Sequence, residues 1–139
     1  MKKLLFIPLA CLLMVTTGCP KGSKSLATAS DAISHGLADA QQAEEQGVTA
    51  GVVSPEADST FKSDLAKVAN AGLVLDNAIR ANEAATTLSP KVNSFLDAFN
   101  TLDNQGLFGI KDPAVRLAIS TALNGAEASI AIIAATVGK

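Results

Sequence analysis

Apolar residues recur at spacings of three and four over four segments of the chain, the spacing that gathers side chains on one face of a helix. The expected helices span about 24–46, 55–85, 90–104 and 113–137. No segment shows the sustained alternation of apolar and polar residues that is typical of strands. The pattern therefore predicts an all-α fold, an uneven antiparallel bundle of about four helices in which the third is the shortest. The residues expected on the inward faces are Leu26, Ala29, Ile33, Leu37, Ala40 and Ala43 in the first helix, Phe61, Leu65, Val68, Gly72, Leu75 and Ile79 in the second, Val92, Phe95, Leu96, Phe99 and Leu102 in the third, and Ile119, Ala122, Ala126, Ile130, Ile133 and Val137 in the fourth.

Capping residues followed by proline mark the expected starts of three helices. Ser or Asp accepts a hydrogen bond from the free N–H groups of the first turn, and proline at the first helical position lacks a donor that would be wasted there. Glycine favours helix ends because it adopts the left-handed cap conformation without strain. The capped starts are Ser54-Pro55, Ser89-Pro90 and Asp112-Pro113, and the glycines expected at helix ends are Gly47, Gly106 and Gly138.

Small residues predict a close contact between helices. Alanine recurs every four residues from Ala114 to Ala126, and such a ridge lets a neighbouring helix approach closely. Three glycines lie inside expected helices, where they are explained either by close crossings or by local bends: Gly36, Gly72 and Gly125. The segment 106–109 follows the short third helix, and we expect it to fold Phe108 over the uncovered end of the bundle.

The first residues of the chain have the features of an export signal. Lys2 and Lys3 precede an apolar stretch from Leu4 to Val15, and small residues follow. The stretch is shorter than the roughly 20 residues that a membrane-spanning helix needs. We therefore expect this segment to direct export and to be removed.

The residues Thr16-Thr17-Gly18-Cys19 resemble the lipobox of bacterial lipoproteins. The resemblance implies cleavage between Gly18 and Cys19, with a covalent diacylglyceryl and N-acyl lipid on Cys19. The chain then divides into a lipoprotein signal peptide (1–18), the acylated cysteine with a short tether (19–24) and a helical bundle domain (25–139). Thr16 departs from the leucine usual at its position. The alternative is an ordinary secretory peptide with Cys19 as a free thiol.

Composition excludes several classes of function. Loss of Lys2 and Lys3 from the 11 basic residues leaves 9 against 13 acidic residues, a net charge of −4 for the mature chain. The chain has neither Trp nor Tyr to stack on bases, so we expect no nucleic-acid partner. Cys19 is the one cysteine outside the signal, which leaves no disulfide to form within the mature chain.

The polar residues do not form a catalytic pattern. The one histidine, His35, has no cysteine partners for a metal site and is expected at a polar helix position. Glu44-Glu45 is expected at a solvated edge, and Asp58 with Lys62 and Asp76 with Arg80 as surface pairs. Ser129 is expected to bond back to its own helix. We therefore expect no enzyme activity, no metal site and no cofactor besides the lipid.

Three functions remain. The first is a non-enzymatic membrane-anchored envelope lipoprotein acting through protein contacts, as a structural or accessory component. The second is a lipoprotein encoded by a phage or mobile element that blocks a surface receptor. The third is a binder of an apolar small molecule or lipid within a loosely packed Ala-rich bundle. The apolar stretch Ser129–Val137 is expected in the core, and the alternative is a face for a partner helix or for lipid. In the lipoproteins that this signal resembles, an aspartate directly after the acylated cysteine is linked to inner-membrane retention in diderm hosts. Pro20 occupies that position here, so in such a host the resemblance favours the periplasmic face of the outer membrane over the inner membrane.

Overall fold

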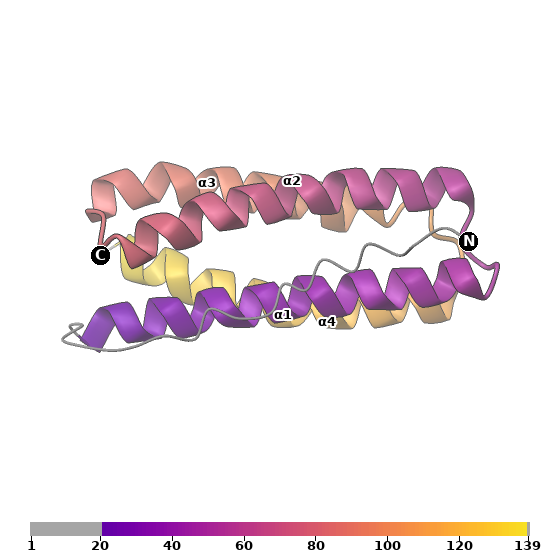
Figure 1. The fold of residues 1–139 in the computed structure, drawn as a ribbon, viewed down its shortest axis with the longest axis horizontal. Coiled ribbons are helices and arrows are strands. Elements are labelled where there is room, and N and C mark those ends of the chain that lie inside the picture. The colour runs from indigo at the N-terminus through magenta and orange to yellow at the C-terminus, as the bar shows by residue number, and fades with distance from the viewer. Residues whose placement is uncertain (1–20, 139) are drawn as a thin grey trace, which may run out of the picture.

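Four helices connected by short turns form an antiparallel bundle (Figure 1). The computed structural model describes residues 21–138, with side chains from Ser25 onward. The helices are α1 (Lys21–Thr49), α2 (Pro55–Arg80), α3 (Ala85–Thr101) and α4 (Pro113–Val137), with a π-helical turn η1 (Leu102–Gly106) extending α3. No strand occurs among the described residues, and the predicted all-α bundle is confirmed.

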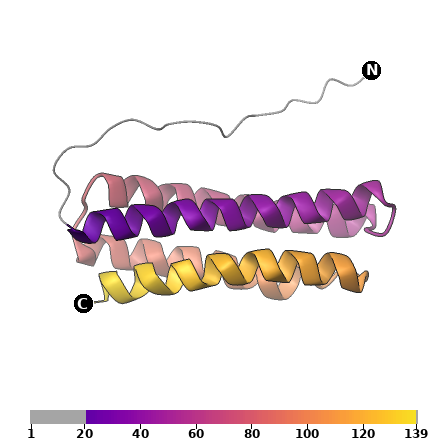
Figure 2. The ribbon, with the colours of Figure 1, turned by 90° about the horizontal axis from the view of Figure 1, so that it is seen from below.

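The bundle consists of two layers, one formed by α1 and α4 and the other by α2 and α3 (Figures 1 and 2). The most extensive interface joins α1 to α4, and α2 packs against both α1 and α3. Because the helices alternate in direction, the start of α1, the turn between α2 and α3, and the end of α4 lie at one end of the bundle. The α1–α2 loop and the segment between η1 and α4 lie at the other.

Two of the three predicted proline starts are confirmed. The Asp112 carboxylate accepts hydrogen bonds from the backbone N–H groups of Ala114 (3.0 Å) and Val115 (2.9 Å), and Pro113 begins α4. The Ser54 hydroxyl accepts from the N–H of Ala57 at 3.2 Å at the start of α2. In both cases a side chain satisfies backbone donors that no helical carbonyl can reach.

The predicted boundary between the second and third helices is wrong. Helix α2 ends at Arg80 rather than near residue 85, because Asn82 turns the chain with a φ of 53°, a conformation that asparagine tolerates better than most residues. Helix α3 then begins at Ala85, and Pro90 lies inside it. Its missing N–H would have bonded the carbonyl of Thr86, which lies on an exposed part of the helix where water can hydrate it.

Helix α1 is longer at both ends than the expected 24–46, and Gly47 is not its terminus. A Cβ at Gly47 would lie 2.7 Å from a methyl group of Val53 and 2.9 Å from one of Val115, so this glycine makes room for its neighbours. At this end of α1 the left-handed backbone conformation occurs at Gly51, with a φ of 72°. At the other predicted ends the structure agrees, since η1 ends at Gly106 and Gly138 caps α4.

The alanine ridge of α4 makes the predicted close contact. A Cβ at Gly36 of α1 would lie 2.9 Å from the backbone oxygen of Ala122 and 3.0 Å from the Cβ of Ala126. A close helix crossing therefore explains Gly36. By contrast, nothing lies within 4 Å of a Cβ at Gly125, which faces open space.

The expectation for Phe108 is wrong, because this side chain is 85% exposed. Its neighbours Leu107 and Ile110 cover the end of the core instead, at 4% and 0% exposure. In the short loop from Leu107 to Asp112, Leu107 and Ile110 are therefore the apolar side chains that turn inward, and Phe108 faces solvent.

Candidate functional site

A groove of about 620 Å³ runs between α1 and α2, and Phe95 of α3 lines its bottom. Its floor is apolar and consists of Ile33, Leu37, Leu65, Leu75 and Phe95. Its rims carry small or polar residues, among them Ser34 and Ala38 on α1 and Ala69 and Asn70 on α2. The inward faces predicted from the helical spacing supply most of the floor.

Gly72 shapes this groove by letting an aromatic ring pass beneath α2. A Cβ at Gly72 would lie 3.1 Å from the ring of Phe95 on α3, closer than an ordinary contact. This contact explains why a glycine occupies a position on the inward face of α2, where a larger residue would otherwise be expected. The ring of Phe95 is fully buried and forms part of the floor.

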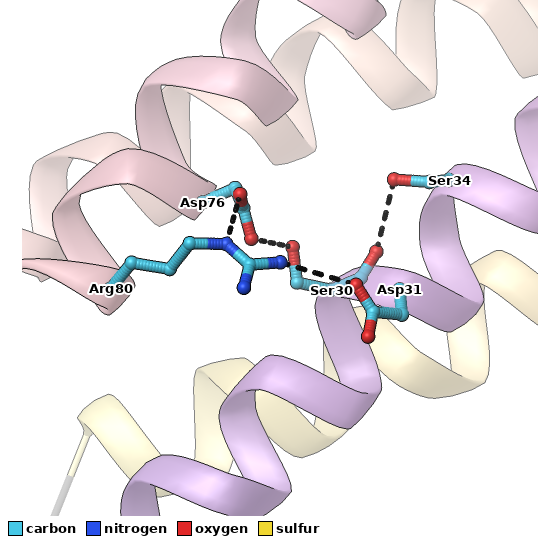
Figure 3. Close-up of polar contacts among 5 residues, drawn as sticks. All are labelled: Ser30, Asp31, Ser34, Asp76 and Arg80. Carbon is cyan, nitrogen blue, oxygen red and sulfur yellow. Dashed lines mark hydrogen bonds and ion pairs between the residues drawn. The ribbon is translucent and has the colours of Figure 1, made fainter. Parts of the chain in front are cut away.

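One end of the groove is closed by a polar cluster that joins α1 to α2 (Figure 3). The Ser30 hydroxyl donates to Oδ1 of Asp76 at 2.7 Å, and Nε of Arg80 donates to Oδ2 of the same carboxylate at 2.7 Å. Nη2 of Arg80 also reaches Oδ1 of Asp31 at 3.2 Å. The Ser34 hydroxyl donates to the carbonyl of Ser30 at 3.2 Å.

The groups of this cluster satisfy one another. Both carboxylate oxygens of Asp76 accept a hydrogen bond, and the adjacent Asp76 carboxylate raises the pKa of Arg80 above its ordinary value. The predicted pair of Asp76 with Arg80 is confirmed, and it extends to a second helix. With its oxygens occupied and a guanidinium fixed beside it, Asp76 is suited to holding α1 against α2 rather than to moving protons.

A second cluster lies between α1 and α2 near the opposite end of the bundle. The Glu44 side chain is fully buried, and no donor reaches either of its carboxylate oxygens. Burial raises the pKa of Glu44 to about 7, and the adjacent Asp58 carboxyl adds to the rise. Lys62 forms an ion pair with Asp58 at 2.5 Å and holds the pKa of that carboxyl below its ordinary value.

The prediction that Glu44 lies at a solvated edge is therefore wrong. The buried face of α1 runs through Ile33 and Ala40, and the helical spacing continues it to Glu44 and Gly47. The expected face instead included Ala43, which is only partly buried. Extending the spacing past the last apolar residue would have identified Glu44 as a buried acid.

The other candidate residues take the structural positions expected of them. His35 is exposed on α1, at the side of a shallow hollow between α1 and α4 that is otherwise lined largely by alanine, glycine and amide side chains. The Ser129 hydroxyl donates to the carbonyl of Gly125 at 3.3 Å, as predicted. Within residues 25–138, no three His, Cys, Asp or Glu side chains are grouped as a metal site requires.

Cys19 and Gly18 lie outside the described residues, so lipidation stays a prediction. Among the described helices, α4 alone is long and apolar enough to cross a membrane by length and composition, with a mean hydropathy of 1.5. Core helices of soluble bundles pass the same test, and α4 contributes Ile119, Leu123 and Ile130 to the core. Comparison with family models, with curated proteins and with solved structures gave no match.

Proposed function

We propose that the protein is a non-enzymatic lipoprotein of the bacterial envelope that acts through protein contacts while a lipid on Cys19 holds it to a membrane. The observation that carries this proposal is the lipobox-like Thr16-Thr17-Gly18-Cys19 immediately before a helical bundle. Helix α1 begins at Lys21, so the body of the protein starts two residues after the proposed anchor. Pro20 favours the periplasmic face of the outer membrane.

The arrangement of polar groups supports contacts rather than catalysis. Each carboxylate oxygen of Asp76 accepts a hydrogen bond, one from Ser30 and one from Arg80, and the Glu44 side chain is fully buried. An exposed aromatic lies at the end of the bundle opposite the start of α1, where Phe108 is 85% exposed. Large apolar side chains that project from a surface are common contact points for protein partners.

Lipidation is tested by labelling cells with a palmitate analogue. Cys19→Ala should abolish labelling and release the protein from membranes, whereas Cys11→Ala should preserve both properties because Cys11 lies within the proposed signal. Equal labelling of the Cys19→Ala variant and the parent would show that Cys19 is not the acceptor. Membrane association without labelling in any form would overturn the lipoprotein proposal.

The protein-contact proposal is tested by photo-crosslinking in membranes. A photoreactive residue at Phe108 should give a discrete adduct with another envelope protein. The matched control is the same residue at Ser63, an exposed position in the first half of α2. Adducts of equal pattern at both positions, or none at either, would count against a specific partner at the Phe108 end.

A second function, binding of an apolar small molecule or lipid, is favoured by the groove between α1 and α2. Its volume of about 620 Å³ and its apolar floor are in the range of small-molecule sites. Native mass spectrometry of the mature protein should then detect a non-covalent adduct. Ala69→Trp, which fills the groove, should remove the adduct, and Ala66→Trp, on the exposed face of α2 outside the groove, should retain it. An adduct that survives Ala69→Trp would show that the groove is not its site.

A further inference from the structure

The last turns of α4 are apolar on both sides of the helix. Ile130, Ile133 and Val137 point into the core. The side facing away from the core carries exposed Ala128, Ala131, Ile132 and Ala135, and Ile132 is 51% exposed. Glu127 is the last charged residue of α4. We call these four exposed residues, Ala128, Ala131, Ile132 and Ala135, the anchor-proximal face.

The neighbouring start of α3 carries little charge, a single ion pair between Glu83 and Lys91. Helix α3 packs against α4 and runs antiparallel to it, so its first turns lie at the same end as the last turns of α4. The sequence from Ala84 to Pro90 contains only alanine, threonine, leucine, serine and proline. Glu83 and Lys91 flank this segment and pair with each other, whereas at the other end the same two helices and their connection carry five charged residues, Asp97, Asp103, Lys111, Asp112 and Arg116. Charge is therefore distributed unevenly along this side of the bundle.

The proposed lipid anchor is attached at the end of the bundle where α4 ends. The start of α1 and the end of α4 lie at the same end of the bundle. Cys19 precedes Lys21 by two residues, and two residues of chain span at most about 7 Å whatever their conformation. A lipid on Cys19 therefore keeps the end of α4 close to the surface of the bilayer.

We propose that the anchor-proximal face lies against the lipid surface, so that the last turns of α4 and the start of α3 contact the membrane while the other end of α4 is held away from it. This inference rests on the proposed lipidation of Cys19. Lipid contact removes apolar surface from water without desolvating a charge on α4 after Glu127. Because the anchor already confines the body to the surface, a contact too weak to bind a free protein is sufficient to orient it.

The orientation has a consequence for the groove. In the bundle, α2 packs against α1 and α3, and so lies diagonally across from α4. When the last turns of α4 contact lipid, the groove between α1 and α2 opens away from the membrane. The groove and the exposed Phe108 end then both remain accessible from the aqueous side.

Tryptophan fluorescence tests this proposal directly, because the natural chain contains neither Trp nor Tyr. Ile132→Trp places a single fluorophore on the anchor-proximal face. Leu117→Trp is the matched control: it lies on the same helix, is 70% exposed, and is about 22 Å away along the axis. Both variants are expressed with their signal peptide and purified from membranes after its removal. They are then reconstituted into vesicles of phosphatidylethanolamine and phosphatidylglycerol, with and without brominated acyl chains.

The expected result is a shift of the Ile132→Trp emission to shorter wavelength on reconstitution, with loss of intensity in brominated vesicles. The Leu117→Trp emission should change in neither respect. Ala128→Trp provides a second reporter on the same face, and it should behave like Ile132→Trp. Circular dichroism establishes that each variant retains the helical content of the parent.

The remaining outcomes separate this inference from the anchoring proposal. If neither variant floats with vesicles, the anchoring proposal fails and this inference fails with it. If both float but bromine quenches neither fluorophore, or both equally, the anchor stands and the lipid-facing role of this end of α4 is overturned. A shift to shorter wavelength without quenching would indicate that another protein molecule covers the face, which also overturns the proposal.

Discussion

Replacement of Glu44 by glutamine should make the protein more stable at pH 8 and leave its stability nearly unchanged at pH 4.5. Glu44 is fully buried, and no donor reaches its two carboxylate oxygens. Ionisation therefore places a negative charge beside the Asp58 carboxylate, with only Lys62 to offset it. A glutamine side chain at this position keeps the shape of the glutamate, never ionises, and supplies an N–H donor for Asp58.

The size of the effect follows from the pKa of Glu44. Burial raises this pKa from 4.5 to about 7. Because the folded state binds the proton more tightly than the unfolded state, the free energy of unfolding falls as the pH rises from 4.5 to 7 and then levels off. A rise of this size corresponds to about 3 kcal/mol. The advantage of Glu44→Gln should therefore grow from near zero at pH 4.5 toward that value at pH 8.

The measurement is urea unfolding followed by far-ultraviolet circular dichroism at a series of pH values. Glu45→Gln is the matched control, because Glu45 is the next residue of α1 and is exposed. It removes the same charge and should produce little change in stability between pH 4.5 and 8. Other charges facing this part of α1 are few, since residues 113–126 of α4 carry only Arg116, which is exposed.

The reasoning would be refuted if the difference between Glu44→Gln and the parent were the same at pH 4.5 and pH 8. It would equally be refuted if Glu45→Gln showed the same pH dependence as Glu44→Gln. A stability gain that grows between pH 4.5 and 7 and then levels off would locate the buried proton on Glu44.

Further expectations concern packing and caps, each checked by thermal or urea unfolding. Gly36→Ala should destabilise the bundle because its Cβ would meet a backbone oxygen of α4 at 2.9 Å. Gly125→Ala should instead stabilise the bundle by up to about 1 kcal/mol, because nothing lies within 4 Å of its Cβ. Equal effects of the two substitutions would contradict the close crossing of α1 and α4. Asp112→Ala should cost about 1 kcal/mol through loss of the cap on α4, and an unchanged midpoint would show that the cap is dispensable. Phe108→Ser should leave the free energy of unfolding within about 0.5 kcal/mol of the parent. Ile110→Ala, at a fully buried position, should lower it by about 2–5 kcal/mol. A large loss of stability from Phe108→Ser would mean that this ring is not exposed.

The number and type of the helices were predictable because local signals and the apolar pattern agreed. Asp112 both caps α4 and precedes a proline, and the inward face that follows has regular spacing. The Ser89-Pro90 pair has the same local form, yet α3 begins five residues earlier. The turn at Asn82 and the burial of Leu88 decide that start, and both depend on how α3 packs against the rest of the bundle.

The polar clusters were less predictable for the same reason. The spacing of Asp76 and Arg80 indicated their pairing along α2, but the contribution of Ser30 from α1 depends on the relative position of two helices. The burial of Glu44 was predictable from the sequence, because Glu44 continues the buried face of α1 that passes through Ala40. Its charge made a solvated position the natural expectation, and only the packing of α2 against α1 places Asp58 and Lys62 beside it.

The interface between α1 and α4 has a consequence for the order in which the molecule assembles. The helices that pack most extensively are the first and the last of the four described helices, so their contact closes the longest loop in the bundle. Helices α2 and α3 can pair through a short turn as soon as both have been made. Helix α1 has no access to its main partner until α4 has been synthesised, and until then its glycine-containing inner face is covered only where α2 reaches it. During synthesis, the N-terminal helix is therefore expected to be among the last elements to become stably packed.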